Sequence, residues 1–154
     1  MLIFLDIDGV MVPAAGWKTP QFLEDGFPAF SLKATAVLQS LISADTTVML
    51  TTSHKSKYTI GEWKDIFERR GIRIEKLKCL DSNDANLSRK DEVLRWFNAN
   101  SIDGGFAIID DDKSLNSLPP LLKEHLILTS SLVGLTKEHL KNIKAVLNKE
   151  PQFA

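Results

Sequence analysis

Five short apolar segments alternate with segments of helical periodicity along this chain. The apolar segments cover residues 2–8, 46–51, 72–80, 106–110 and 125–130. The helical segments begin at polar residues that suit an N-cap, namely Ser31, Thr59, Ser88 and Thr136. Alternating strands and helices are typical of an α/β sandwich around a parallel sheet. The sequence therefore predicts a mainly parallel central sheet of about five strands, with segment 72–80 at an edge.

The size and charge of the chain narrow its class. Its 154 residues, 44% hydrophobic and 25% charged, fit one ordinary globular domain, so we expect residues 1–154 to form a single domain. The net charge of -1 gives no reason to expect bulk binding of nucleic acid or of anionic membrane. Cys79 is the only cysteine, which excludes an internal disulfide. Because no apolar stretch reaches membrane-spanning length, we expect a cytoplasmic protein.

One long irregular segment, residues 11–30, interrupts the alternation. It contains three prolines and two glycines, which disfavour a helix or a strand: Pro13, Pro20, Pro28, Gly16 and Gly26. Loops of this length are usually functional or mobile, so we expect a flap-like loop. Trp17 in this loop can either stack on a ring of a ligand or anchor the loop to the core. The sequence leaves both roles open.

Carboxylates stand at the ends of two predicted strands. Asp6 and Asp8 end the first segment, and Asp110, Asp111 and Asp112 end or follow the segment FAIID. Right-handed crossovers place the carboxyl ends of parallel strands at one edge of the sheet, where ligands bind. If these two strands are neighbours, up to four carboxylates converge, while Asp112 is expected to face water or cap the next turn. Such a cluster needs a cation, and an all-oxygen site suits Mg²⁺.

Hydroxyl and cationic groups are expected at the same edge. Thr51, Thr52 and Ser53 end or follow the second predicted strand, and Arg89 and Lys90 begin the third helix. A carboxylate nucleophile, a metal, hydroxyl donors and a cation are the parts that phosphoryl transfer requires. The sequence therefore points to phosphoryl chemistry at this edge.

Four motifs resemble those of the haloacid dehalogenase (HAD) superfamily and occur in the same order. DIDGV resembles the first motif, in which DxDG and a Thr or Val follow a hydrophobic strand, and VMLTTS, RKDEVL and AIIDDD resemble the next three. The tail SSLVGLTKEHLKNIKAVL resembles the ending of a small capless subgroup related to the phosphatase-like domains of RNA-repair polyproteins. The resemblance implies a Rossmann-like, three-layer fold without a large cap domain.

The resemblance also implies roles for the acidic residues. Asp6 would be the nucleophile that becomes an aspartyl-phosphate, and Asp8 would be the general acid and then the general base. Mg²⁺ would be held by Asp6, by the backbone carbonyl of Asp8, and by Asp110 and Asp111.

The phosphate-binding roles fall on two pairs of adjacent residues. The resemblance implies that Thr51 binds the phosphoryl oxygens and that Lys90 stabilises their charge. A one-residue shift would give these roles to Thr52 and Arg89 instead, and the sequence leaves both alternatives open. After the second motif the chain reads SHK where the subgroup frequently has S-x-W-R, which leaves the role of Lys55 open.

The second aspartate indicates the reaction. A phosphatase must protonate an alkoxide leaving group, whereas a dehalogenase releases a halide that needs no proton, so Asp8 favours phosphoester hydrolysis. With no large cap, the expected substrate is a small phosphoester, a nucleic-acid end or a phosphoprotein. A catalytically idle binding module is an alternative, and so is a phospho-acceptor signalling domain, although the order of the acidic and basic residues speaks against the latter. His54 is expected to be a polar loop residue rather than a ligand or a base.

Overall fold

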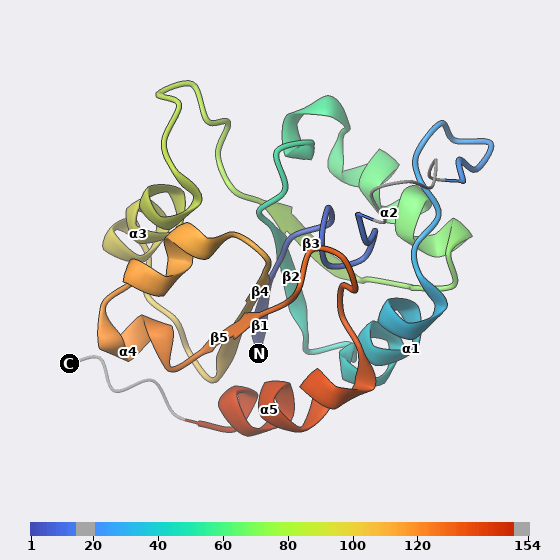
Figure 1. The fold of residues 1–154 in the computed structure, drawn as a ribbon. Helices are drawn as coiled ribbons and strands as arrows, with labels where there is room; N and C mark the ends of the chain where they lie inside the picture. The colour runs from blue at the N-terminus through green and yellow to red at the C-terminus, as the bar shows by residue number, and fades with distance from the viewer. Residues whose placement is uncertain (15–20, 150–154) are drawn as a thin grey trace.

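A computed structural model describes residues 1–14 and 21–149 of the chain, in which strands and helices alternate (Figure 1). The strands are β1 (Leu2–Leu5), β2 (Thr47–Leu50), β3 (Lys76–Cys79), β4 (Phe106–Asp110) and β5 (Leu126–Leu128). The helices are α1 (Leu32–Leu41), α2 (Ile60–Arg69), α3 (Arg89–Ala99), α4 (Pro120–Lys123) and α5 (Lys137–Leu147). Two short 3-10 turns, η1 (Lys55–Lys57) and η2 (Lys113–Ser117), follow β2 and β4.

The strands form one parallel sheet in the order β3-β2-β1-β4-β5. The predicted parallel sheet of about five strands is therefore confirmed, and β3 lies at an edge as expected. β1 is central, because Leu5 lies beside Leu50 of β2 and beside Ile109 of β4. Phospho-acceptor receivers of the flavodoxin-like type have the order 2-1-3-4-5 instead. The observed order thus differs from the fold that the phospho-acceptor hypothesis requires.

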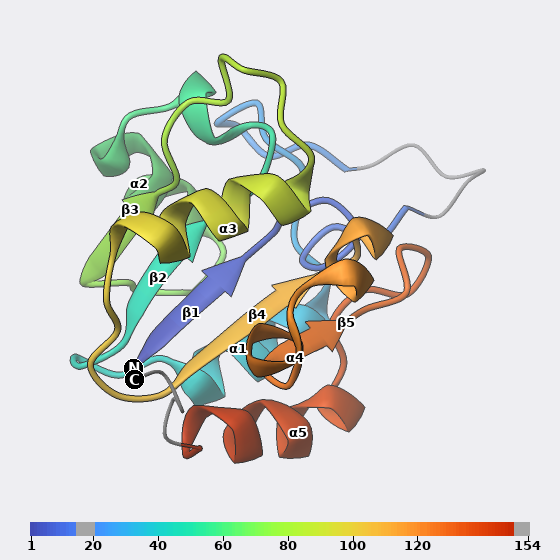
Figure 2. The ribbon, with the colours of Figure 1, turned by 90° about the vertical axis from the view of Figure 1, so that its left-hand side faces the viewer.

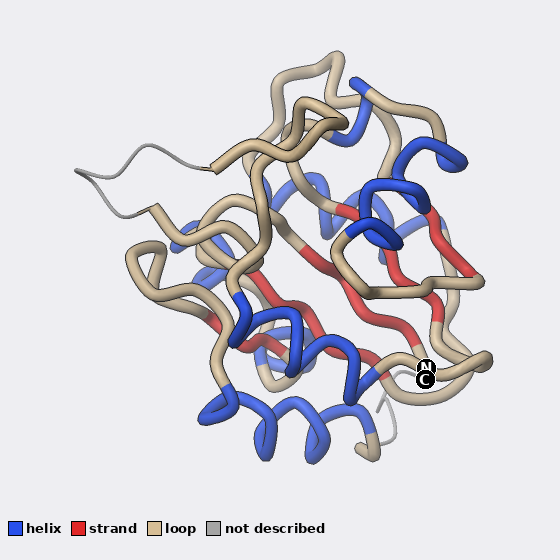
Figure 3. The backbone as a smooth tube through the Cα atoms, turned by 90° about the vertical axis from the view of Figure 1, so that its right-hand side faces the viewer, coloured by secondary structure: helices blue, strands red, loops and turns tan. Residues whose placement is uncertain are grey.

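Helices cover both faces of the sheet and give three layers, as the views from its two sides show (Figures 2 and 3). Side chains alternate between the faces along a strand. Ile3 and Leu5 of β1 accordingly belong to the core cluster that α1, α2 and α5 cover. Phe4 belongs to the other cluster, which lies under α3 and α4. The Rossmann-like sandwich predicted from the sequence is confirmed.

Side-chain caps explain where three helices begin. The hydroxyls of Ser31, Thr59 and Ser88 each accept a hydrogen bond from the backbone N–H three residues further on, at 3.0, 3.1 and 3.2 Å. These predicted helix starts are therefore confirmed. The sequence did not predict η2 and α4, which are too short to show a helical period. Their apolar residues Leu115 and Leu122 are buried in the cluster under α3 and α4.

The acidic motif lies in a turn and not within the first strand. β1 ends at Leu5, earlier than predicted, because the carbonyl of Ile7 accepts hydrogen bonds from three backbone N–H groups of residues 10–12. These bonds close a turn at residues 7–12. The hydroxyl of Thr129 donates to the carbonyl of Gly9 at 2.8 Å and ties this turn to the chain that follows β5.

The described part of the long loop, residues 21–30, is fixed to the end of α2. Two guanidinium nitrogens of Arg70 pair with the carboxylate of Asp25 at 2.7 and 3.0 Å, and Arg70 also donates to the carbonyl of Phe27 at 2.8 Å. The Phe27 ring is buried. This half of the loop is therefore part of the packed structure. Trp17 lies outside the described residues, and a flap-like motion of the loop stays a prediction.

The carboxyl edge of the sheet carries no large cap. In residues 1–14 and 21–149, the connections between strands contain short helices and loops only. None of the helices in this part of the chain is long and apolar enough to cross a membrane.

Candidate active site

Parallel pairing of β1 and β4 brings the two acidic segments together. Leu5 lies beside Ile109, and the N–H of Asp6 donates to the carbonyl of Ile109 at 3.1 Å. One carboxylate oxygen from each of Asp6, Asp110 and Asp111 lies within 4.8 Å of the other two. Asp6 is 4% exposed and Asp110 is 0% exposed. We call these three residues the carboxylate cluster.

Burial makes the ionised forms of two of these groups costly. Desolvation, reinforced by the neighbouring Asp110, raises the pKa of Asp6 to about 9. Burial also raises the pKa of Asp110, although the guanidinium of Arg89 opposes the shift. A divalent cation between these groups would favour their ionised forms. A set of carboxylate oxygens, two of them on desolvated side chains, fits Mg²⁺.

Arg89, and not Lys90, reaches the carboxylate cluster. Nη1 of Arg89 lies 2.6 Å from Oδ2 of Asp110 and 3.5 Å from Oδ1 of Asp6. Consecutive residues of a helix point roughly 100° apart, so only one of this adjacent pair can face the strand ends. The backbone N–H of Lys90 donates to the hydroxyl of Ser114 in η2, at 3.3 Å. Within residues 1–14 and 21–149, its ammonium forms no ion pair with the cluster.

Thr51 and Thr52 follow β2 and have different partners. The hydroxyl of Thr51 lies 3.4 Å from Oδ2 of Asp110, to which it donates, and it accepts a hydrogen bond from Arg89 at 3.3 Å. The hydroxyl of Thr52 accepts the backbone N–H of His54 at 3.3 Å. Thr51 therefore lies at the carboxylate cluster, whereas Thr52 shapes the loop that follows.

Gly9 leaves the space that Asp111 occupies. Its φ of +81° lies in the left-handed region, and a Cβ at this position would overlap the Asp111 carboxylate. Any larger residue would therefore displace a member of the carboxylate cluster as well as strain the backbone.

We expect the Gly9→Ala variant to lose stability and Mg²⁺ binding together. The left-handed backbone alone costs about 1–2 kcal/mol for a residue with a Cβ. Urea unfolding and an Mg²⁺ titration measure the two effects. Gly61→Ala is the matched control, because a Cβ there meets only the Thr59 hydroxyl, at 3.9 Å. Equal behaviour of the two variants would contradict the close packing of Gly9 and Asp111.

Asp112 lies next to the carboxylate cluster but has another function. Its Oδ1 accepts the backbone N–H of Ser114 at 2.9 Å, which caps η2. This is one of the roles expected for it from the sequence. Asp111 and Asp112 therefore form an adjacent pair of which one member belongs to the cluster.

Mg²⁺ is expected to stabilise the protein through Asp111 and not through Asp112. At about 100 times its Kd, a ligand adds roughly 2.7 kcal/mol, which raises Tm by roughly 5–10 °C for a domain of this size. We expect Asp111→Asn to lose most of this shift and Asp112→Asn to keep it. Thermal unfolding with and without Mg²⁺ measures the difference. A wild-type protein that Mg²⁺ does not stabilise would contradict the metal site.

Asp8 lies apart from the carboxylate cluster, on the open side of the turn. Its side chain is 57% exposed, and its Oδ2 lies 2.7 Å from Nε2 of His54. His54 was expected to be a polar loop residue, so its contact with a predicted catalytic residue was missed. The departure SHK after the second motif was the only signal in the sequence that pointed to this position.

Lys55 lies behind the site and not in it. Its Nζ is 2.8 Å from Oε2 of Glu92, and the two side chains are 4% and 5% exposed. Oε1 of Glu92 lies 3.7 Å from Nε of Arg89. The Lys55–Glu92 pair thus supports Arg89 from the core, and the Lys55 ammonium does not face the open edge.

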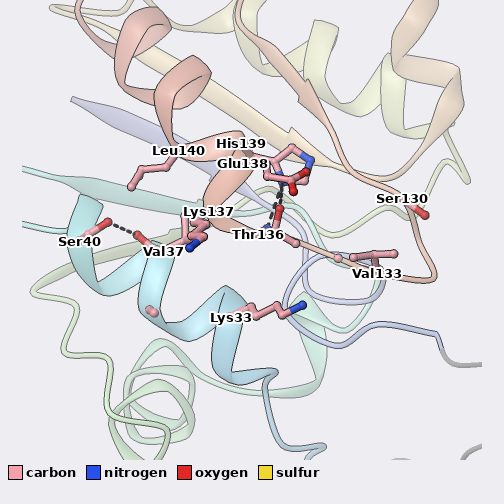
Figure 4. Close-up of a pocket in the computed structure, with 12 residues that line it drawn as sticks. Lys33, Val37, Ser40, Ser130, Val133, Thr136, Lys137, Glu138, His139 and Leu140 are labelled. Atoms are coloured by element: carbon pink, nitrogen blue, oxygen red, sulfur yellow. Dashed lines mark hydrogen bonds between the residues drawn. The ribbon is translucent and has the colours of Figure 1, made fainter.

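A separate cavity of about 730 Å³ lies between α1 and the first turn of α5 (Figure 4). Lys33, Val37, Thr136 and Leu140 are among its lining residues. No residue of the carboxylate cluster lines it, and neither do Asp8 or Arg89. The cavity is therefore distinct from the acidic edge.

The fold and the acidic strand ends define a protein of the HAD superfamily. Residues 2–140 match the family described as the HAD domain in Swiss Army Knife RNA repair proteins. The chain belongs to this family, in agreement with the resemblance found in its motifs. No curated protein and no solved structure matched the sequence significantly.

Proposed function

We propose that this chain is an Mg²⁺-dependent phosphoester hydrolase that forms an aspartyl-phosphate on Asp6. The observation that carries the proposal is the placement of Asp6. It directly follows the central strand β1, its Oδ1 lies 3.5 Å from Nη1 of Arg89, and it belongs to the carboxylate cluster with Asp110. Asp8 follows on the exposed side of the same turn. Membership of the HAD family supports phosphoester chemistry in general.

In the first step, a carboxylate oxygen of Asp6 attacks the phosphorus of the ester. The bond from phosphorus to the leaving oxygen breaks, its electron pair passes to that oxygen, and Asp8 supplies the proton, so that an alcohol leaves. Nη1 of Arg89 lies 3.3 Å from the hydroxyl of Thr51. Both groups would donate hydrogen bonds to the phosphoryl oxygens. Mg²⁺ held by the carboxylate cluster would supply further positive charge.

In the second step, Asp8 acts as a base. Its carboxylate, now without the proton, takes one from a water molecule whose oxygen attacks the phosphorus. The bond between phosphorus and Asp6 breaks, inorganic phosphate leaves and the Asp6 carboxylate is restored. The exposed side chain of Asp8 suits both proton transfers, because its carboxyl group must contact the leaving group in the first step and water in the second.

The substrate is proposed to be a phosphorylated nucleic-acid end, with a small phosphoester as the alternative. The absence of a large cap in the described residues supports access by a bulky substrate. The family description names RNA repair, which favours a nucleic-acid end. The net charge of -1 means that recognition would depend on local contacts at the edge and not on a basic surface.

Phosphate release from a panel of phosphomonoesters tests the function. The panel holds 5′- and 3′-phosphorylated oligonucleotides, alkyl phosphates and aryl phosphates, each assayed with Mg²⁺ and with EDTA. We expect release that requires Mg²⁺ and is fastest with an oligonucleotide. A protein that binds Mg²⁺ but releases no phosphate from any of them would support the idle binding module and contradict the proposal.

A further inference from the structure

The proposed acid and base, Asp8, forms a hydrogen bond with the side chain of His54. An exposed carboxylate on a turn can rotate freely unless a partner holds it. Among residues 1–14 and 21–149, one hydrogen bond reaches the Asp8 carboxylate, between its Oδ2 and Nε2 of His54 at 2.7 Å. The two residues come from different strand ends, since Asp8 follows β1 and His54 follows β2.

His54 is itself held in place from the backbone and from the ring. Its N–H donates to the Thr52 hydroxyl at 3.3 Å, and its carbonyl accepts the N–H of Lys57 at 2.9 Å. Its ring meets the ring of Phe27 edge to face, with centroids 5.8 Å apart. The imidazole is therefore presented to Asp8 by a packed turn.

Phe27 links this arrangement to the long loop. It is buried, its ring packs edge to face against Tyr58 and Trp63, and its carbonyl accepts a hydrogen bond from Arg70 at 2.8 Å. His54 thus rests on a segment whose own position is fixed.

From this geometry we propose that His54 is a positioning residue for Asp8. Its hydrogen bond holds the carboxyl where it can protonate the leaving oxygen, and His54 itself does not touch the substrate. The inference rests on the proposed phosphoester hydrolysis. It goes beyond it by assigning a role to a residue outside the four HAD motifs.

If His54 positions Asp8, the effect of replacing His54 on kcat/KM should depend on the leaving group of the ester. A general acid matters for an alkyl phosphate, whose alkoxide needs a proton, and little for an activated aryl phosphate, whose phenolate leaves unaided. The value of kcat/KM reports only the steps up to departure of the leaving group, so the later activation of water does not enter the comparison. A positioning role therefore appears as a loss in kcat/KM that is much larger on the alkyl ester than on the aryl ester.

The experiment compares wild type, His54→Phe and His54→Gln on both esters. His54→Phe keeps a ring against Phe27 but removes the hydrogen bond, and His54→Gln keeps a polar group that can reach Asp8. We expect His54→Phe to lower kcat/KM roughly 10- to 100-fold on the alkyl ester and far less on the aryl ester. We expect His54→Gln to recover much of the loss. In an Asp8→Asn background, His54→Phe should cause no further loss on the alkyl ester.

Four results distinguish a failure of the inference from a failure of the proposed function. An equal loss on both esters, or no loss on either, in an active and folded enzyme would overturn the role of His54 and leave the hydrolase intact. A further loss from His54→Phe in the Asp8→Asn background would also overturn it. A wild type that releases no phosphate from either ester or from any other member of the panel would overturn the proposed function and the inference with it. Thermal unfolding of each variant shows that the comparison is made on folded protein.

Discussion

Replacing Asp6 by asparagine should abolish phosphate release and leave the protein folded. The amide keeps the size of the side chain but cannot form the aspartyl-phosphate. Removal of a covalent nucleophile costs at least about 10⁴-fold in rate. We therefore expect release from the best ester of the panel to fall by at least that factor, in the presence of saturating Mg²⁺.

Stability distinguishes this loss from simple unfolding. Burial and the neighbouring Asp110 raise the pKa of Asp6 to about 9, so the carboxyl group at this position is poorly suited to carry a charge. A neutral amide resembles the protonated carboxyl group that this pKa favours in the absence of Mg²⁺. We therefore expect Asp6→Asn to unfold in the absence of Mg²⁺ at a temperature no lower than wild type. Asp45→Asn, an exposed change at the other end of the sheet, is the control with unchanged rate. Substantial activity in Asp6→Asn would exclude Asp6 as the nucleophile.

Replacing Lys55 by methionine should have the largest effect on stability. The ion pair between Nζ of Lys55 and Oε2 of Glu92, at 2.8 Å, is almost completely buried. Removing one partner of such a buried pair costs about 3–5 kcal/mol. In Lys55→Met the buried Glu92 carboxylate would keep only the more distant contact with Nε of Arg89, at 3.7 Å. We expect urea unfolding to report a loss of this size.

Two further variants show whether the ion pair is the cause. Lys57→Met changes an exposed lysine of the same turn η1 and should alter the free energy of unfolding by less than about 0.5 kcal/mol. In the double variant Lys55→Met with Glu92→Leu, both charges are gone, and we expect a smaller loss than in Lys55→Met alone. A loss in Lys55→Met no greater than that in Lys57→Met would contradict the buried pair.

The strands of the sheet were predictable from the sequence because each apolar segment is long enough to show its pattern. The three hydroxyl caps at Ser31, Thr59 and Ser88 were predictable for a similar reason, since a cap is a local feature. The end of β1 could not be predicted from the sequence. A strand stops where the hydrogen bonds of the following turn begin, and the bonds to the carbonyl of Ile7 depend on the fold of residues 10–12.

The candidate site was predictable as a set of motifs but not atom by atom. Motif order places Arg89 and Lys90 equally well, and only the docking of α3 on the sheet decides that Arg89 faces Asp110. The motif also fits Thr51 and Thr52 equally well. Only the path of the chain after β2 places the Thr51 hydroxyl at Asp110 and the Thr52 hydroxyl at the N–H of His54. No periodicity connects Asp8 with His54.

The central claim is that Asp6 carries the phosphoryl group during turnover, and trapping that group tests it most directly. The wild type and Asp8→Asn are quenched in acid during hydrolysis of the best ester, digested, and the peptide that contains Asp6 is analysed by mass spectrometry. We predict a phosphoryl group on Asp6, with a larger amount in Asp8→Asn when an activated aryl ester is used, because the base for the second step is missing. Phosphate release without a phosphoryl group on Asp6 in either protein would contradict the mechanism.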